Sequence, residues 1–172
     1  LYADQYLFVN GYPKRILANG ATPIGILSSD GYAAQDSLAL CDAFVFCGGA
    51  RFYPYHFQIM EYAAKSGKPV LGICLGMQML FDESEEFGLH KGLGLIPGRV
   101  VRIPDVDADG SPQRVPHISW NPLYPAGGRT DFSGTALQNV QPGQECYFIH
   151  SYEAKPAAEE YRLADTVYGG RK

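Results

Sequence analysis

Short apolar runs alternate with an amphipathic stretch in the first half of the chain. Residues 43–47 form a continuous apolar run, and residues 70–73 form a second one after a Gly-Lys-Pro turn. Runs of this length and composition are typical of strands in a parallel sheet that is buried on both faces. Between them, residues 55–65 carry apolar side chains on one broad face and stop at Gly67, which predicts the helix that crosses between the strands.

The rest of the pattern extends this alternation and then changes. Residues 10–19, with Pro13 near their start, predict a first helix, and residues 22–27 predict a strand. Beyond Gly88 the chain turns to short β-like pieces separated by Gly, Pro and Asp loops. We therefore expect an α/β fold with a doubly wound, mostly parallel sheet and added strands that cover the site. The predicted added strands are residues 99–103, 115–120, 145–151 and 162–168.

One cysteine lies where the second apolar run meets the segment after it. Cys74 stands between Gly72 and Gly76, and no breaker interrupts the stretch from Met77 to Phe81. The pattern predicts a strand that ends at Cys74 and a helix that begins at Leu75, with the glycines allowing strand and helix to approach closely. A thiol above a helix N-terminus has a lowered pKa and can act as a nucleophile. A small apolar residue in a buried corner is the alternative interpretation.

Two other segments carry polar groups at the ends of predicted strands. Because neighbouring parallel strands end at a common crevice, the backbone amides of Gly49 and Leu75 are predicted to bind a developing oxyanion. An ordinary Gly-Gly turn is the alternative at Gly49. Late in the chain, an apolar strand ends in His150, Ser151 and Tyr152. A histidine at a strand end is often a hydrogen-bonded structural residue, and the pattern alone does not give His150 a catalytic role.

Composition narrows the classes of protein. The 172 residues suffice for one domain with a core of its own, and the hydrophobic content is 46%. A net charge of −4 without a basic patch argues against nucleic acid and anionic membranes as partners, and no apolar run is long enough to span a bilayer. The four cysteines lack metal-ligand or disulfide spacing, so we expect no metal, no other cofactor and a reducing, cytoplasmic location.

Residues 72–78, Gly-Ile-Cys-Leu-Gly-Met-Gln, resemble the signature of class I glutamine amidotransferases, whose fold is flavodoxin-like. In that family the cysteine attacks the side-chain amide of glutamine, so the resemblance implies that Cys74 is the nucleophile and that Gln78 holds the substrate. Further strings are similar, in order, to the glutaminase subunit of imidazole glycerol phosphate synthase. They are residues 84–86, 91–100, 115–121 and 147–152.

The same resemblance assigns substrate contacts. In the synthase glutaminase, a His-Ser-Tyr loop and a glutamate bind glutamine, which implies this role for His150, Ser151, Tyr152 and Glu86. A carboxylate opposite an α-ammonium group is physically sensible, although a solvated charge in an acidic cluster is the alternative at Glu86. The amino-terminal region, residues 6–27, is instead similar to gamma-glutamyl peptide hydrolases of the same superfamily.

The chain departs from the family pattern at two places. The family usually has Pro-Gly-Val-Gly where this chain has Cys-Gly-Gly-Ala at residues 47–50, which moves the oxyanion donor to Gly49 and suggests a site less dependent on a partner. The family also completes a Cys-His-Glu triad with a Phe-His-Pro-Glu segment, and His-Pro-Glu does not occur in this sequence. We expect residues 1–172 to form a single amidotransferase domain that lacks the first strand and the strand with the triad His and Glu.

The resemblance implies a glutaminase that hydrolyses glutamine to glutamate and ammonia through a cysteine thioester. The ammonia would pass to a synthase partner, a TIM-barrel cyclase if the similarity to the enzyme of histidine biosynthesis holds. Two alternatives remain open: a gamma-glutamyl peptide or amine hydrolase that acts without a partner, and a catalytically inactive binding module. The amidotransferase predicts slow glutaminase activity that a synthase accelerates. The gamma-glutamyl hydrolase predicts turnover that does not depend on a partner, and the inactive binding module predicts neither activity.

Overall fold

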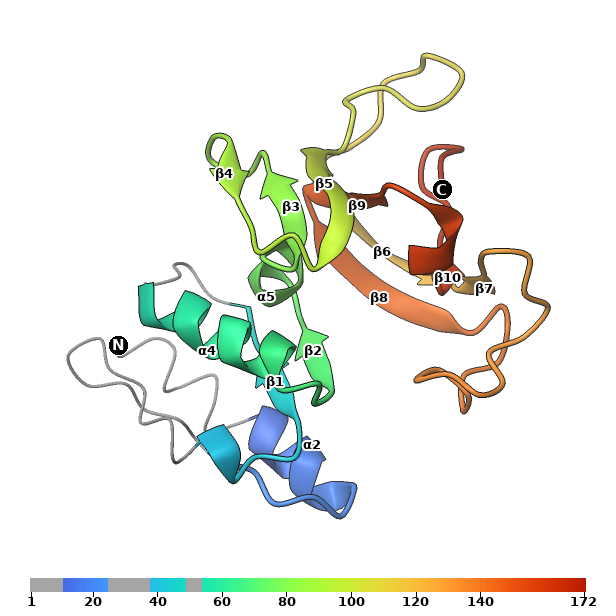
Figure 1. Cartoon of the computed structure of the whole chain (residues 1–172). Helices are drawn as coiled ribbons and strands as arrows, with labels where there is room; N and C mark the ends of the chain where they lie inside the picture. Colours follow the sequence, from blue (N-terminus) through green and yellow to red (C-terminus); the bar gives the residue numbers. More distant parts are fainter. Residues whose placement is uncertain (1–10, 25–37, 49–53) are drawn as a thin grey trace. The chain divides into compact units, whose positions relative to one another are not determined.

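The computed structural model describes residues 11–24, 38–48 and 54–172. The chain divides into two compact units, Leu1–Gln78 and Met79–Lys172. In the described part of the first unit, helices alternate with strands in the order α2 (Tyr12–Ala18), β1 (Phe44–Phe46), α4 (Pro54–Lys65), β2 (Val70–Gly72) and α5 (Leu75–Gln78) (Figure 1).

A parallel strand pair and its crossover helix form the core of the first unit. Strands β1 and β2 run parallel, with Phe44 opposite Val70 and Phe46 opposite Gly72. Helix α4 connects them, and its Tyr62 ring meets the ring of Phe44 edge-on at 6.2 Å. This arrangement confirms the α/β class, because parallel neighbours require a crossover connection. The buried side chains of the unit include Phe44, Phe46, Ile59, Met60 and Ala63.

The first unit matches the sequence pattern at three predicted elements and differs at the burial of the sheet. The predicted strands at residues 43–47 and 70–73 and the helix at 55–65 are confirmed as β1, β2 and α4. The prediction that the strands are buried on both faces is wrong in the described residues, since Val45 is 39% and Leu71 is 55% exposed. Alternate residues of β1 are buried, as expected of strands covered on one face by a helix.

The segments that flank this core agree less well with the secondary structure predicted from the sequence. The first predicted helix, residues 10–19, is confirmed as α2, which has Pro13 in its first turn. The predicted strand at residues 22–27 is wrong for residues 22–24, which carry no regular structure, and residues 25–27 lie outside the described residues. The predicted helix after Cys74 is a single turn, because Phe81 already lies on strand β3 and pairs with Ile96. An apolar run without a period does not distinguish a buried helix from a buried strand.

The second unit is built from strands. Its main sheet has the order β4-β3-β5-β9, in which β3 (Phe81–Ser84) and β5 (Ile96–Arg102) are parallel and the other pairs are antiparallel. Strands β6 (His117–Pro122) and β8 (Glu145–His150) form a long antiparallel pair (Figure 1). The remaining elements are β4 (His90–Lys91), β7 (Tyr124–Pro125), β9 (Tyr152–Pro156), the 3-10 helix Glu159–Tyr161 and β10 (Ala164–Asp165).

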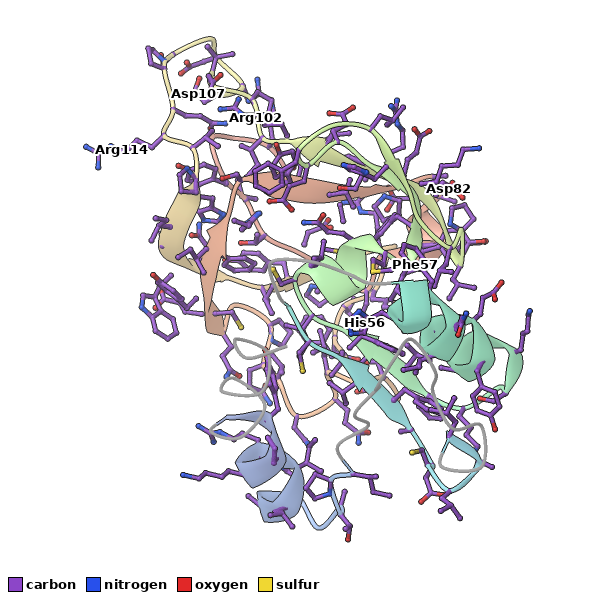
Figure 2. The ribbon with its side chains drawn as sticks, turned by 90° about the vertical axis from the view of Figure 1, so that its left-hand side faces the viewer. His56, Phe57, Asp82, Arg102, Asp107 and Arg114 are labelled. Carbon is purple, nitrogen blue, oxygen red and sulfur yellow. The ribbon has the colours of Figure 1, made fainter. Side chains whose placement is uncertain are left out.

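A side-chain hydrogen bond joins β3 and β5 of the main sheet. The Asp82 carboxylate on β3 accepts a hydrogen bond from the Gly98 amide at 2.8 Å, and Figure 2 shows Asp82 near one end of the sheet and Arg102 near the other. The predicted strands at residues 99–103, 115–120 and 145–151 correspond to β5, β6 and β8. The strand predicted at 162–168 shrinks to the two residues of β10, and β9 was not predicted.

Candidate active site

Cys74 occupies a strained turn between β2 and α5. Its side chain is exposed, and its φ of 55° places a non-glycine residue in the left-handed region. Among the described residues, Phe87 is the other non-glycine residue with a positive φ. Such a conformation costs on the order of 1–3 kcal/mol and persists where the surrounding structure enforces it, which is typical of functional sites. The predicted nucleophile elbow therefore has the expected backbone geometry.

Close backbone packing on both sides of the cysteine enforces this turn. A β-carbon on Gly76 would lie 2.2 Å from the carbonyl oxygen of Phe46 on β1. A β-carbon on Gly72 would lie 2.7 Å from the carbonyl oxygen of Gly76 and from the Cα of Met77. Real β-carbons do not approach backbone atoms so closely, so both positions require glycine. The geometry confirms that these glycines let the strand and the helix on either side of Cys74 approach closely.

Gly48 is the glycine of the preceding loop that the structure places beside Cys74. A β-carbon at Gly48 would lie 2.8 Å from the Cβ and 3.2 Å from the Sγ of Cys74. Any larger residue would press on the thiol, so the absence of a side chain keeps the space beside the sulfur open. The predicted oxyanion donor, Gly49, lies outside the described residues.

Backbone amides of α5 donate hydrogen bonds to the carbonyl oxygen of Cys74. The amides of Met77 and Gln78 donate to the carbonyl oxygen of Cys74 at 2.9 and 3.1 Å, and the Gly76 amide donates to Ile73 at 3.0 Å. The Leu75 amide takes no part in these three hydrogen bonds and directly follows the nucleophile in the chain. This position suits the predicted role of an oxyanion donor. The side chain of Gln78, predicted to hold the substrate, is only 8% exposed.

The sequence pattern gave no role to Tyr12 or Cys47, and the structure links both to the site around Cys74. Burial raises the pKa of the Tyr12 hydroxyl, and negative charge on Cys47 and Cys74 raises it further, so Tyr12 of α2 lies within electrostatic reach of both thiols. Burial also raises the pKa of the Cys47 thiol. A raised pKa lowers the fraction of thiolate at neutral pH, which makes the Cys47 thiol less reactive.

The predicted substrate residues of the second unit gather at one end of its main sheet. His150 ends β8, Ser151 forms the turn, and Tyr152 begins β9 opposite Arg102 of β5. Glu86 leaves the parallel neighbour β3 at the same end, where the Glu85 amide donates to Val100 at 3.0 Å. Figure 2 marks this end of β5 by the label on Arg102. Glu86 and the turn at residues 150–152 thus lie at the same end of the sheet, with β5 between their strands.

His117 is a buried residue of this unit to which the sequence analysis gave no role. Its side chain is 1% exposed, and its ring stacks on the ring of Tyr168 with centroids 3.9 Å apart. The Nδ1 of His117 lies 3.0 Å from the Nε2 of His150. The signal in the sequence was the alternation of polar residues at 117, 119 and 121, which on a strand places three polar side chains on one face.

Across residues 11–24, 38–48 and 54–172, no group of three or more His, Cys, Asp or Glu side chains is placed to hold a metal ion. Within the same described ranges, no helix is both long and apolar enough to cross a membrane.

The strand-to-helix cysteine turn on a parallel α/β core defines the class of the protein. The chain belongs to the class I glutamine amidotransferase family, whose model matches residues 24–169. The chain is also similar to the imidazole glycerol phosphate synthase subunit HisH 1 of Legionella pneumophila (strain Lens). The two are 49% identical over 108 residues, which covers 63% of this chain and 51% of that subunit.

Other HisH subunits give the same result. The subunit of Geobacillus thermodenitrificans is 52% identical over 106 residues, covering 62% of this chain and 47% of that protein. The subunit of Bacillus licheniformis is 44% identical over 110 residues, covering 64% of this chain and 49% of that protein. The chain thus spans about half the length of the curated relatives it matches.

Proposed function

We propose that the chain is a glutaminase domain that hydrolyses glutamine to glutamate and ammonia, with Cys74 as the nucleophile. The observation that carries this proposal is the exposed cysteine at φ 55° in a strand-to-helix turn, within a chain that belongs to the class I amidotransferase family. Similarity to HisH subunits supports a place in histidine biosynthesis.

The proposed reaction has two halves. The Cys74 thiolate attacks the carboxamide carbon of glutamine, and the amides of Leu75 and Gly49 stabilise the oxyanion of the tetrahedral intermediate. When the intermediate collapses, the C–N bond breaks, ammonia leaves with a proton from a general acid, and a thioester remains. Water then attacks the thioester carbon, which releases glutamate and restores the thiolate. We assign the acid and base role to the histidine of the family's His-Pro-Glu segment, which does not occur in these 172 residues.

Further residues are assigned to substrate recognition. The Glu86 carboxylate is proposed to bind the α-ammonium group of glutamine, since an ionised pair with hydrogen bonds gives orientation as well as affinity. The turn at His150, Ser151 and Tyr152 lies at the same end of the sheet as Glu86 and is proposed to bind the α-carboxylate end. Gln78, one turn after the nucleophile, is likewise proposed to bind glutamine.

An apolar face supports the proposal of a synthase partner. On one face of the β6 and β8 pair, Ile118 lies opposite Ile149 and Trp120 lies opposite Tyr147. All four side chains are more than half exposed, with Trp120 at 63%. Contiguous exposed apolar side chains of this size are typical of protein interfaces, and tryptophan and tyrosine are common hot spots. We propose that the ammonia-accepting subunit, a TIM-barrel cyclase, docks on this face.

Replacing Trp120 by alanine is expected to weaken docking of the cyclase subunit about 30-fold or more, since buried aromatic hot spots contribute about 2 kcal/mol or more. The measurement is the glutaminase rate titrated with the synthase subunit. Leu89→Ala is the matched control, because Leu89 is exposed but lies outside β6 and β8. Equal affinity of the Trp120 variant and the control would remove this face from the proposed interface.

A gamma-glutamyl peptide or amine hydrolase is the alternative, supported by the resemblance of residues 6–27 to such enzymes. It predicts that the protein turns over gamma-glutamyl peptides at the same rate with and without a synthase subunit. Turnover of glutamine that rises at least tenfold on adding the synthase subunit would decide for the amidotransferase.

A further inference from the structure

The buried imidazole of His117 stacks on two aromatic rings and has polar partners at both nitrogens. It stacks on Tyr168, and on the ring of Phe148 at 5.3 Å with an angle of 10° between the ring planes. Strand β6 carries His117 opposite His150 of β8. A buried polar ring in such a setting needs a partner at each nitrogen, and the identity of those partners fixes where its protons lie.

The contacts of His150 determine its tautomer. Its Nδ1 lies 2.8 Å from the carbonyl oxygen of Tyr152, which can only accept a hydrogen bond. Nδ1 must therefore carry the proton, and the Nε2 of neutral His150 is an acceptor. The Nδ1 of His117, at 3.0 Å from this Nε2, must be the donor. The direction of the chain of hydrogen bonds is thereby fixed from His117 through His150 to Tyr152.

The other side of His117 is fixed by Asn121. The Asn121 amide nitrogen donates to the Val167 carbonyl at 3.0 Å, so its oxygen is the atom that faces the Nε2 of His117, at 2.9 Å. The Nε2 also lies 2.8 Å from the Ser119 hydroxyl. The Ser119 hydroxyl also donates to the Asn121 oxygen. In neutral His117 the Nε2 accepts only when the Ser119 proton turns from the Asn121 oxygen to this nitrogen, whereas a second proton on Nε2 would be donated to the Asn121 oxygen.

We propose that His117 is a positioning residue for the turn at Ser151 and Tyr152, which it controls through the relay His117 Nδ1–H to His150 Nε2 and His150 Nδ1–H to the Tyr152 carbonyl. Its effect on glutamine binding rests on the proposed function, which assigns this turn to the substrate. The relay engages both ring nitrogens of His150. His150 therefore acts on the substrate by holding the backbone of the turn, and no nitrogen of its ring is left to transfer a proton.

The setting of His117 keeps it neutral at physiological pH. Burial lowers the pKa of His117, the hydrogen bond that its ring can donate to the Asn121 oxygen opposes this shift, and positive charge on His150 adds to it. The charged groups that line the adjoining cavity are Glu153, Asp165, Arg171 and Lys172. Glu153 and Asp165 are paired with Lys155 and Arg162.

The sign of the resulting pH dependence follows from linkage. A lowered pKa means that folded His117 binds fewer protons than unfolded His117 between that pKa and the ordinary value of about 6.5. The unfolding free energy should therefore rise with pH across this window and stop rising above it. Below the window, His117 is protonated at Nε2 and donates to Asn121.

The relay can be tested by nitrogen-15 NMR of the imidazoles in the 172-residue chain. We expect His150 to carry its proton on Nδ1 at neutral pH, and we expect His117→Phe, which keeps the ring stack, to abolish this preference. His90→Phe, at an exposed histidine of β4, is the matched control. Asn121→Asp should raise the pKa of His117 by about 1 to 3, because an anionic acceptor favours the imidazolium. This substitution leaves the imidazole ring of His117 in place.

The functional consequence is measured by comparing KM and kcat for glutamine in the glutaminase assembled with its synthase subunit. The proposed role predicts a change in KM but little change in kcat. His117→Phe should raise the KM for glutamine about tenfold, the equivalent of one lost hydrogen bond, and leave kcat within about threefold. A proton on Nε2 of His150 in the unsubstituted protein would overturn the relay, and an unchanged KM would overturn its positioning role. A protein that carries the family's His-Pro-Glu segment and has no glutaminase activity at all would contradict the proposed function instead, and the tautomer of His150 would still decide the relay.

Discussion

Cys74→Ser is expected to lower the rate of glutamine hydrolysis by about 10⁴-fold or more, because removal of a catalytic nucleophile has effects of this size. A serine hydroxyl is almost fully protonated at neutral pH, whereas a thiol supplies a useful fraction of thiolate. The exchange of sulfur for oxygen is nearly isosteric, and the exposed side chain of Cys74 leaves the core unchanged. The fold of the variant should therefore be retained, as circular dichroism can show.

The other cysteines provide matched controls for this substitution. Cys146→Ser and Cys41→Ser remove a thiol elsewhere in the chain, and their glutaminase rates should stay within about threefold of the unsubstituted protein. Activity of Cys74→Ser within tenfold of these controls would exclude Cys74 as the nucleophile. The assay is best done on the protein assembled with its synthase, where the rate is expected to be highest.

Gly76→Ala should destabilise the first unit by about 2 kcal/mol and abolish glutaminase activity as well. Alanine at a helical position usually stabilises by up to about 1 kcal/mol relative to glycine. Here the new β-carbon would lie 2.2 Å from the carbonyl oxygen of Phe46, and relief of this overlap requires a backbone shift that costs about 1–3 kcal/mol or more. The steric cost exceeds the helix preference, and the shift displaces the neighbouring Cys74. Urea denaturation measures the change in unfolding free energy.

Gly11→Ala is the control for this effect. A β-carbon at Gly11 has nothing within 4 Å, and the φ of Gly11 is −119°, which alanine readily adopts. Its unfolding free energy should change by less than about 0.5 kcal/mol. If Gly76→Ala behaved like Gly11→Ala and kept full activity, the tight contact between β1 and α5 would have no part in holding the nucleophile.

The elbow could be predicted from the sequence because its requirements are local. A cysteine between two glycines, after an apolar run, is a pattern whose geometry follows from sterics, and Cys74 has the positive φ that this geometry needs. The helix after it was overestimated, since the run from Leu75 to Phe81 has no period that separates helix from strand. Pairing of Phe81 with Ile96, a long-range contact, decides the matter.

The second unit was harder to predict because its polar contacts join distant segments. The strings around residues 115–121 and 147–152 indicated a family, but they did not show that His117 and His150 face each other across β6 and β8. Nor could a pattern of residues show that Asn121 bonds to the backbone of Val167, 46 positions away. The role of His117 follows only from the direction of these hydrogen bonds.

The most direct test of the central claim is the order in which the four cysteines react with a diazo-ketone analogue of glutamine. Tandem mass spectrometry of peptides taken at early times reports each thiol separately. We predict that Cys74 is modified first, and that excess glutamine protects it, because a bound analogue places its electrophile beside this sulfur. Modification spread evenly over Cys41, Cys47, Cys74 and Cys146, or without protection by glutamine, would contradict the assignment of Cys74 as the glutaminase nucleophile.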